Sequence, residues 1–412
     1  MKDIRVNVDA SIVVCPFRAP INGQGFSNCL ANEGTHRRVE DYLGSYEDHC
    51  GFPLRNSCAV HSDEIAALTD DGALKSLVKP VIEGDACNTH ACAVSVCRSA
   101  GLFHPSTGFQ RGLDLGLLSR DDCGFESEKR LFSPNRSQLT PLCSAVTTDL
   151  IRKPSFSAYV MLSRLREGLM QAESSDPGFG DGFGIIPTRD EDSFGFMFWN
   201  AGNEDSGAEI KLVRLTVERC PFNGEYRLLH YRIDAAHSNT HAVWRYLGSP
   251  EKPDVNQIRM MREHENPALV EPVRSIAVED VFELQVSMPA DSVSLLLAVP
   301  VNEARPASPR WVRGVDEKGC NGNRQIFLKW TPSSEKDFVY YRLWRKSGNG
   351  EFAAVPSRGL LGTAVFTDMD VAPEETYVYR VDAVNASRKL SGQSGNLTVH
   401  HDGGGQCQDR KS

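Results

Sequence analysis

The chain has 412 residues, of which 40% are hydrophobic and 24% charged, and its formal net charge is −9 at pH 7. This length predicts two or three domains, and this composition is ordinary for a globular protein with a sizeable core. No basic cluster is dense enough to follow a phosphate backbone, which excludes nucleic acid as a partner. The most apolar run, 292–301, is far shorter than the roughly 20 residues that span a bilayer, so we expect no membrane helix.

The first third of the chain differs in composition from the rest. Nine of the 12 cysteines lie in residues 1–143. Residues 1–149 also lack clear periodicity, because Gly, Ser, Asn, Asp and Cys interrupt nearly every apolar run. We expect an irregular, Cys-rich or partial α/β region here. The N-terminus MKDIRVNVDASIVVCPF has about six apolar residues in a row, fewer than the roughly 7–15 of a signal-peptide core, so no signal peptide is predicted.

One segment of this region contains residue types that bind metals. Cys87, His90, Cys92 and Cys97 lie in CNTHACAVSVC. Structural zinc sites place two to four residues between paired ligands and a second pair further along the chain. Because this spacing does not fit, disulfides or free thiols are favoured. No metal site and no cofactor are predicted.

From Ile151 onward the pattern becomes regular. RKPSFSAYVMLSRLREGLMQAE has Pro154 at its start and apolar residues at helical spacing, which predicts an amphipathic helix over 155–171 with one buried stripe. The residues of that stripe are Ala158, Leu162, Leu165 and Leu169.

Strand-like runs follow this helix. Phe194, Phe196 and Phe198 alternate in SFGFMFWNAG, and EIKLVRLTVER, EYRLLHYRID and VFELQVSMP continue the strands between polar turns. Several such strands without helical crossovers predict an antiparallel β-sandwich over residues 174–301. Together with the helix this gives a domain over 150–301.

The stretch HYRIDAAHSNTHAVWRYLGSP, residues 230–250, changes from a strand to a short helix. Ser238 or Asn239 can cap that helix, and Trp244 belongs to its apolar face. A second helix begins after Asp254, which forms a capping box with Gln257.

His237 and His241 are four residues apart, as in some metal sites. However, His237 precedes the helix cap, and no nearby third ligand completes a site. Hydrogen-bonded structural histidines are therefore favoured over metal ligands.

The last part of the chain predicts a separate β module over 306–400. IFLKWTPS, DFVYYRLWRK and TYVYRVDAVN are strand runs, with Trp330 on an early strand and Tyr377 and Tyr379 on a late one. This pattern is typical of a fibronectin type III-like sandwich. Residues 401–412 are expected to be a disordered tail. The fold class expected for the whole chain is mainly β.

Residues 148–301 resemble a known enzyme family. HYRIDAAHSNTHAVWRYLGSPEKPDVNQIRMMREHENPALVEP is similar to the C-terminal sandwich of glycoside hydrolase family 39, and within it to the α-L-iduronidases of animals. LIRKPSFSAYVMLSRLREG resembles the last barrel helix of those enzymes, and DSVSLLLAV extends the similarity downstream. The terminal fibronectin type III-like module also agrees with iduronidase domain order. In this resemblance the 230–250 stretch belongs to the accessory sandwich, which implies that its residues have a structural and not a catalytic role.

The resemblance implies a chemistry. Family 39 enzymes are retaining glycosidases with two glutamates about 5 Å apart on a (β/α)8 barrel. For iduronidases the substrate is terminal iduronic acid on dermatan or heparan sulfate, degraded in the lysosome. A glycosaminoglycan oligosaccharide is therefore the implied partner if a barrel is present, and the localisation is lysosomal by resemblance.

The chain departs from this pattern at the catalytic part. A barrel takes about 200–250 residues, whereas only residues 1–149 precede the domain that contains the helix predicted over 155–171. The Asn-Glu-Pro triplet of the family acid/base does not occur: Asn32 and Glu33 are followed by Gly34, and Ser62-Asp63-Glu64 only faintly resembles the nucleophile segment. No catalytic residue is assigned. Residues 1–149 are either a divergent barrel remnant or a mis-translated segment.

Two hypotheses for function follow. One is an α-L-iduronidase-like O-glycosyl hydrolase that is catalytically incomplete in this chain. The alternative is a non-catalytic interaction protein built from the sandwich and the fibronectin type III-like module. Asn135, Asn385 and Asn396 begin glycosylation sequons, which would be modified if the chain enters the secretory pathway. The oligomeric state is left open.

Overall fold

The computed structural model describes residues 1–8, 13–14, 93–94, 97 and 151–402, the last range without 167, 181, 202–209, 251–252, 319–323 and 356–359. Most of the 1–149 region and residues 403–412 therefore lie outside the described residues. The described part is mainly β, as predicted. It falls into two compact units, one ending at Asn302 and the other beginning at Glu303.

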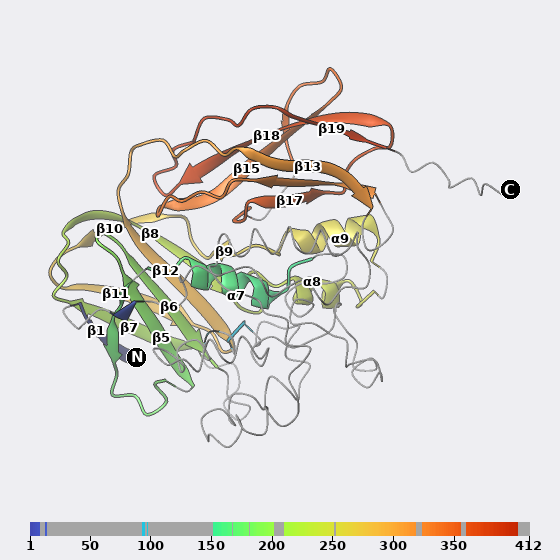
Figure 1. Cartoon of the computed structure of the whole chain (residues 1–412). Coiled ribbons are helices and arrows are strands. Elements are labelled where there is room, and N and C mark those ends of the chain that lie inside the picture. The colour runs from blue at the N-terminus through green and yellow to red at the C-terminus, as the bar shows by residue number, and fades with distance from the viewer. Residues whose placement is uncertain are drawn as a thin grey trace, which may run out of the picture. The chain divides into compact units, whose positions relative to one another are not determined.

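The first unit contains a four-stranded sheet in the order β11-β7-β1-β4 (Figure 1). Its strands are β1 (Lys2–Asn7), β4 (Gln171–Glu173), β7 (Lys211–Glu218) and β11 (Phe282–Met288). In β11, Phe282, Leu284, Val286 and Met288 are buried while the residues between them are exposed. This alternation is the period-two pattern of a sheet with one face toward a core, and it confirms the strand predicted there.

Strand β1 was not expected from the sequence. It lies inside the sheet, parallel to β7 and antiparallel to β4. Ile4 and Val6 are fully buried, whereas Asp3 and Arg5 are exposed. A single strand of six residues carries too short an alternation to be recognised before its distant partners are known.

The second sheet of this unit has eight antiparallel strands, in the order β10-β8-β12-β6-β5-β3-β2 with β9 pairing with β8. Its strands are β2 (Val13–Val14), β3 (Gly168–Leu169), β5 (Phe183–Arg189), β6 (Phe194–Asn200), β8 (Gly224–Ile233), β9 (Ala268–Leu269), β10 (Arg274–Val278) and β12 (Ser292–Pro300).

The two central strands β6 and β12 are buried on both faces. In β6, Phe196 and Phe198 belong to the core between the two sheets. Met197 and Trp199, on the opposite face of the same strand, are also buried. Strands that bury their side chains on both faces are typical of a sheet covered on both sides. The predicted antiparallel sandwich is present, and its larger sheet has a second covered face.

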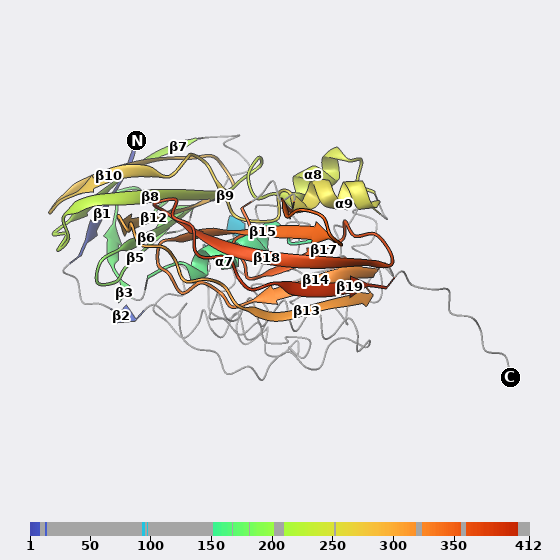
Figure 2. The same cartoon turned by 90° about the horizontal axis from the view of Figure 1, so that it is seen from above.

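Helix α7 (Pro154–Ser163) lies against that second face, next to β8 (Figure 2). Arg164 Nη1, at the end of α7, donates a 2.7 Å hydrogen bond to Tyr231 Oη of β8. The prediction of an amphipathic helix over 155–171 is wrong in two respects. The helix ends at Ser163, because Gly168 and Leu169 pair with β5 as a strand. It is also buried on more than one side, since Ser157, Ala158, Val160, Met161 and Leu162 are all buried.

Two short helices follow β8, as the sequence predicted. They are α8 (Thr240–Tyr246) and α9 (Val255–Arg262). Asn239 Oδ1 caps α8 by accepting a hydrogen bond from the Ala242 N–H at 3.0 Å. Asp254 and Gln257 form the predicted capping box of α9, with both hydrogen bonds at 2.9 Å. No described helix has the length and hydrophobicity that a membrane crossing requires.

The second unit has three-stranded and four-stranded antiparallel sheets, in the orders β13-β14-β17 and β16-β15-β18-β19. Its strands are β13 (Trp311–Lys318), β14 (Arg324–Trp330), β15 (Phe338–Ser347), β16 (Ala353–Ala354), β17 (Val365–Asp368), β18 (Glu375–Asn385) and β19 (Leu397–His401).

This unit has the core expected of a fibronectin type III-like sandwich. Trp330 is fully buried and packs edge-on against Tyr341, with ring centroids 5.3 Å apart. Tyr377 Oη accepts a 2.7 Å hydrogen bond from the Ala372 N–H. A tyrosine on this late strand that bonds to backbone a few residues upstream is the tyrosine corner of such sandwiches.

Candidate functional site

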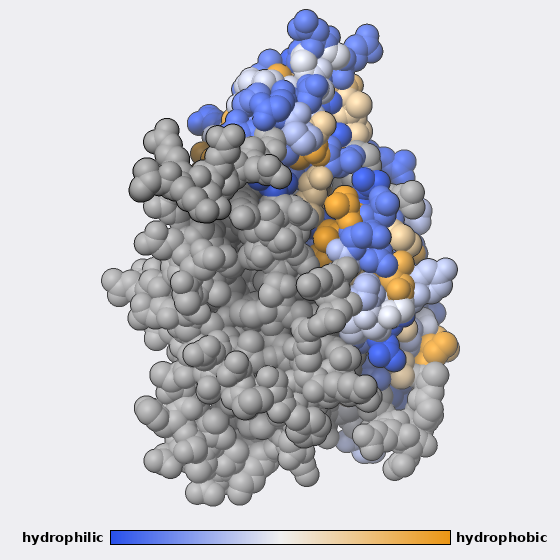
Figure 3. Space-filling model, turned by 90° about the vertical axis from the view of Figure 1, so that its right-hand side faces the viewer, coloured by the Kyte–Doolittle hydropathy of each residue, from blue (hydrophilic) through white to orange (hydrophobic). Residues whose placement is uncertain are grey.

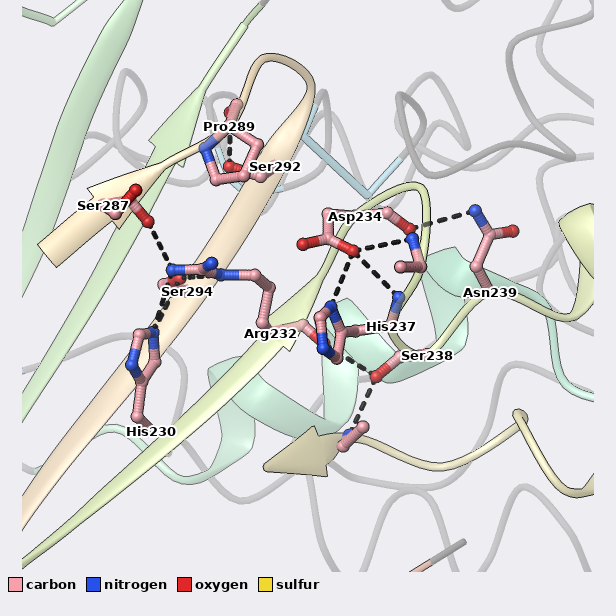
Figure 4. A network of polar contacts seen from close by, with 12 residues as sticks. His230, Arg232, Asp234, His237, Ser238, Asn239, Ser287, Pro289, Ser292 and Ser294 are labelled. Atoms are coloured by element: carbon pink, nitrogen blue, oxygen red, sulfur yellow. Dashed lines mark hydrogen bonds and ion pairs between the residues drawn. The ribbon is translucent and has the colours of Figure 1, made fainter. Parts of the chain in front are cut away.

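A polar cluster replaces the apolar core at one end of the first unit's sandwich (Figure 4). Tyr226 and Leu228 of β8 belong to the core between the sheets. His230 and Arg232 are on the same face by the period-two rule and are 8% and 6% exposed. Ser294 of β12 is the direct register partner of Arg232. His230, Arg232 and Ser294, together with Ser287 of β11, are called the inter-sheet network below.

Arg232 joins the two sheets of the sandwich. Its Nε donates a 3.0 Å hydrogen bond to Ser294 Oγ in the larger sheet. Its Nη2 donates to the Ser287 carbonyl oxygen in the smaller sheet. Burial lowers the pKa of Arg232, while the nearby carboxylates of Asp234 and Glu271 oppose that shift. An arginine remains protonated under such a shift, so a buried cation lies between the sheets.

The contacts of His230 fix its tautomer. Its Nε2 lies 3.0 Å from Ser294 Oγ and 3.3 Å from Arg232 Nη2. Because a guanidinium can only donate, Nε2 must accept, which places the ring proton on Nδ1. Burial first, and then the charge of Arg232, lower the pKa of His230 to about 3.

The neighbouring carboxylate of Glu271 does not reverse this shift. Its Oε1 lies 3.7 Å from His230 Nδ1 and 3.3 Å from Arg274 Nε, and its side chain is 42% exposed. A half-exposed carboxylate shared with an arginine is screened by water, whereas the histidine ring is buried. His230 is therefore neutral at physiological pH and is not available as a general acid.

The loop after β8 is held by Asp234. One carboxylate oxygen, Oδ1, accepts three 2.8 Å hydrogen bonds, from the Ala236 N–H, the His237 N–H and His237 Nδ1. Burial alone would raise the pKa of Asp234, but these hydrogen bonds outweigh it and the pKa is lowered. An ionised aspartate with this set of donors is a turn-forming residue.

Ser238 and Asn239 connect the same loop to its surroundings. Ser238 Oγ donates to the Arg232 carbonyl at 2.7 Å and accepts from the Ala268 N–H of β9 at 2.8 Å. Asn239 Nδ2 donates to the Asp234 carbonyl at 3.0 Å. Residues 232–239, which belong to the stretch that resembles family 39, thus connect β8, β9 and α8.

The two histidines of this stretch that are four residues apart do not come together as ligands. His237 is bonded to Asp234, and the His241 ring packs beside Trp244 with centroids 5.5 Å apart. Among the residues that the structure describes, no group of three or more His, Cys, Asp or Glu side chains could hold a metal ion.

A second polar connection between the sheets was missed by sequence reasoning. Asn200, at the end of β6, donates through Nδ2 to the carbonyls of Met288 and Pro289, at 3.0 and 2.8 Å. Lys211 Nζ donates to its Oδ1 at 2.7 Å. The sequence does contain one signal for this region. Ser292 and Ser294 occupy alternate positions of an apolar strand, in step with the residues that face the core.

Several sequence-predicted residues lie outside the described part of the chain: Glu33, Glu64, Cys87, His90, Cys92 and Asn135. Cys97 is buried. Of the two described sequons, Asn385 is 1% exposed and Asn396 lies at the surface. The catalytic residues stay unassigned.

Residues 133–280 match the sequence profile of glycosyl hydrolases family 39, which supports the resemblance seen in the sequence. This match includes His230 and Arg232 of β8 and the Asp234 loop, and it ends before Ser287 and Ser294. Comparison with curated proteins gave no match.

Among solved structures, the chain is similar to a bacterial orthologue of human α-L-iduronidase. The identity is 23% and the TM-score 0.52, over 61% of this chain and 43% of that one. The chain thus covers less than half of the length of that structure. Two further similarities are to the family 39 enzyme of Xanthomonas axonopodis pv. citri and to a fibronectin type III-like protein of Clostridium thermocellum. For the first, the identity is 17% and the TM-score 0.39, over 52% of this chain and 42% of that one. For the second, the identity is 21% and the TM-score 0.20, over 24% of this chain and 95% of that one. Because only the first TM-score exceeds 0.5, the likeness in fold rests on the iduronidase orthologue.

Proposed function

We propose that residues 151–402 are the non-catalytic scaffold of an α-L-iduronidase-type glycoside hydrolase. The observation that carries this proposal is that the buried polar side chains of the 230–250 stretch make structural contacts. His230 is neutral, Arg232 bonds to both sheets, and Asp234 is occupied by its own loop. The likeness of the fold to a bacterial iduronidase orthologue supports the enzyme class.

The proposed substrate is a terminal iduronic acid on a dermatan or heparan sulfate chain, and the proposed place of action is the lysosome. Both follow from the resemblance to iduronidases. The two carboxylates of retaining hydrolysis must be held about 5 Å apart, and neither family motif occurs in this sequence. Residues 1–412 alone are therefore expected to show no turnover.

The activity test uses the full chain and a fluorogenic α-L-iduronide at acidic pH, beside Glu33→Gln and Glu64→Gln variants. The proposal expects the same background signal from all three proteins. Turnover by the parent chain that disappears in either variant would overturn it, because residues 1–149 would then hold the active site.

A second test addresses the enzyme class itself. The gene and its transcripts can be sequenced across the region that encodes residues 1–149. The proposal expects a transcript that joins a barrel segment with an Asn-Glu-Pro triplet to residues 150–402. If every transcript encodes residues 1–149 as they stand here, the non-catalytic interaction protein is the better description.

Figure 3 shows one face of the molecule, on which the interaction hypothesis can be considered. On the coloured part of that face, hydrophobic residues form small groups among hydrophilic ones. Docking surfaces for proteins are usually larger continuous apolar patches. The glycosidase scaffold is the function that we put forward, because the family 39 profile match and the likeness in fold support it.

A further inference from the structure

The two described glycosylation sequons differ in accessibility. We propose that Asn396 carries an N-linked glycan when the chain passes through the secretory pathway, and that Asn385 remains unmodified as a structural residue. An N-glycan is attached to the side-chain nitrogen of asparagine and leaves a bulky, solvated group on the surface. In the folded and secreted protein, a glycosylated asparagine must therefore lie at the surface.

Asn385 does not meet this requirement. It is 1% exposed, and its Nδ2, the atom that would receive the sugar, donates a 3.2 Å hydrogen bond to the Ala304 carbonyl. Its Oδ1 accepts a 2.8 Å hydrogen bond from the Lys389 N–H. Asn385 thus closes the turn after β18 through Oδ1 and ties that turn to the segment before β13 through Nδ2.

The hydroxyl oxygen of that sequon is also buried. Ser387 Oγ has no exposed surface and no hydrogen-bond partner among the described residues. Arg388 follows with a φ of +60°, and its N–H donates to the Asn385 carbonyl at 2.9 Å. A tight, internally bonded turn leaves no room for a bulky glycan in the folded protein, so a chain that carried one on Asn385 would not reach this fold and would not be secreted. A glycan on Asn385 would break the hydrogen bond to Ala304.

Asn396 has the opposite environment. It is exposed and lies just before β19, where residues 391–396 form no helix or strand. Its Oδ1 accepts a 2.7 Å hydrogen bond from Arg380 Nε, which leaves Nδ2 without a bond to a described residue. Thr398, the hydroxyl residue of this sequon, is exposed as well.

The neighbours of Asn396 offer a surface for the first sugar. Arg380 stacks on the ring of Phe352, with its Cζ 4.0 Å from the ring centroid, and also donates to Gln393 Oε1 at 3.2 Å. Arg380 is thereby held in place while it orients the Asn396 amide. A glycan at this position would extend from the outer side of the four-stranded sheet.

The test expresses the full chain in secretory cells behind an added cleavable secretion signal, in an Asn135→Gln background. The added signal makes the result independent of the proposed lysosomal localisation, so this proposal and that one can fail separately. Two matched variants each remove one sequon without changing its asparagine, Ser387→Ala and Thr398→Ala. Glycans are counted by the gel shift on deglycosylation and located by mass spectrometry of the secreted protein.

We expect one glycan on the parent chain, its complete loss in Thr398→Ala and Asn396→Gln, and no change in Ser387→Ala. Because Ser387 Oγ has no partner to lose, that variant should be secreted as well as the parent. A glycan on Asn385 in secreted protein would overturn the proposal. An unmodified Asn396 in secreted parent chain would overturn it equally.

Discussion

Arg232 of β8 donates a hydrogen bond to the Ser287 carbonyl of β11, so that one buried cation holds the two sheets of the sandwich together. The same side chain bonds to Ser294 and approaches His230. This relationship explains why a stretch rich in histidine and charge can lie inside a sandwich. A buried charge is tolerated where its donors find acceptors, and removing one partner leaves the others unsatisfied.

Strand β1 can be tested by truncating its buried side chain. Ile4 is fully buried between the sheets, so Ile4→Ala should lower the free energy of unfolding by about 2–5 kcal/mol. Arg5→Ala, on the exposed face of the same strand, should change it by less than about 0.5 kcal/mol. Urea unfolding of the full chain measures both. Equal, small effects would show that β1 does not pack into the sandwich.

Helix α8 offers a matched pair of aromatic residues. Trp244 is 3% exposed and its Nε1 donates to the Pro250 carbonyl at 3.0 Å, whereas Tyr246 is 84% exposed. Trp244→Ala should cost about 3–5 kcal/mol, and Tyr246→Ala less than about 0.5 kcal/mol. The comparison by urea unfolding removes any effect of helix propensity, since both residues are replaced by alanine. A Trp244 effect as small as that of Tyr246 would mean that α8 is not docked.

The pKa of His230 predicts a loss of stability in acid. Its native pKa is about 3, and an unfolded histidine has a pKa of about 6.5. Between these values the unfolded state binds a proton that the native state does not, so stability falls as the pH falls. At pH 5 this loss is about 2 kcal/mol relative to pH 7.

His230→Gln keeps an acceptor near Ser294 and Arg232 but cannot be protonated. The difference in unfolding free energy between pH 7 and pH 5 should therefore be about 2 kcal/mol smaller in the variant than in the parent chain. Denaturant unfolding at the two pH values provides the comparison. An unchanged difference would show that His230 is not the buried neutral group described here.

The tyrosine corner tests the fold of the second unit. Tyr377→Phe removes the acceptor of the Ala372 N–H, and an unpaired backbone donor costs about 1–3 kcal/mol. Tyr340→Phe, on the neighbouring β15, removes a half-buried hydroxyl and should change stability by less than about 0.5 kcal/mol. Thermal unfolding of both variants distinguishes the two. A neutral Tyr377→Phe would count against the fibronectin type III-like arrangement.

Local patterns predicted much of this fold. The alternation in β11, the Asn239 cap, the Asp254 capping box and the burial of Trp244 all follow from residues within one or two turns of each other. Such features are encoded where they occur, and the structure confirms them.

Features that depend on distant partners were missed or misjudged. The position of β1 depends on β7, about 200 residues further along the chain. The end of α7 depends on the pairing of Gly168 and Leu169 with β5, which overrides a helical spacing of leucines. The inter-sheet network includes Ser287 and Ser294 from other strands. The 230–250 stretch alone therefore indicated a structural role but not which strands Arg232 connects.

The most direct test of the scaffold role is the free energy of unfolding of Arg232→Met, measured in urea beside Arg227→Met. Arg232 lies in the inter-sheet network, whereas Arg227 of the same strand makes surface contacts with Glu225 and Ser275. We expect a loss of about 2–3 kcal/mol for Arg232→Met, because the buried acceptors on Ser287 and Ser294 lose their donor, and less than about 1 kcal/mol for Arg227→Met. An Arg232→Met protein as stable as the parent chain would contradict a structural role for this motif.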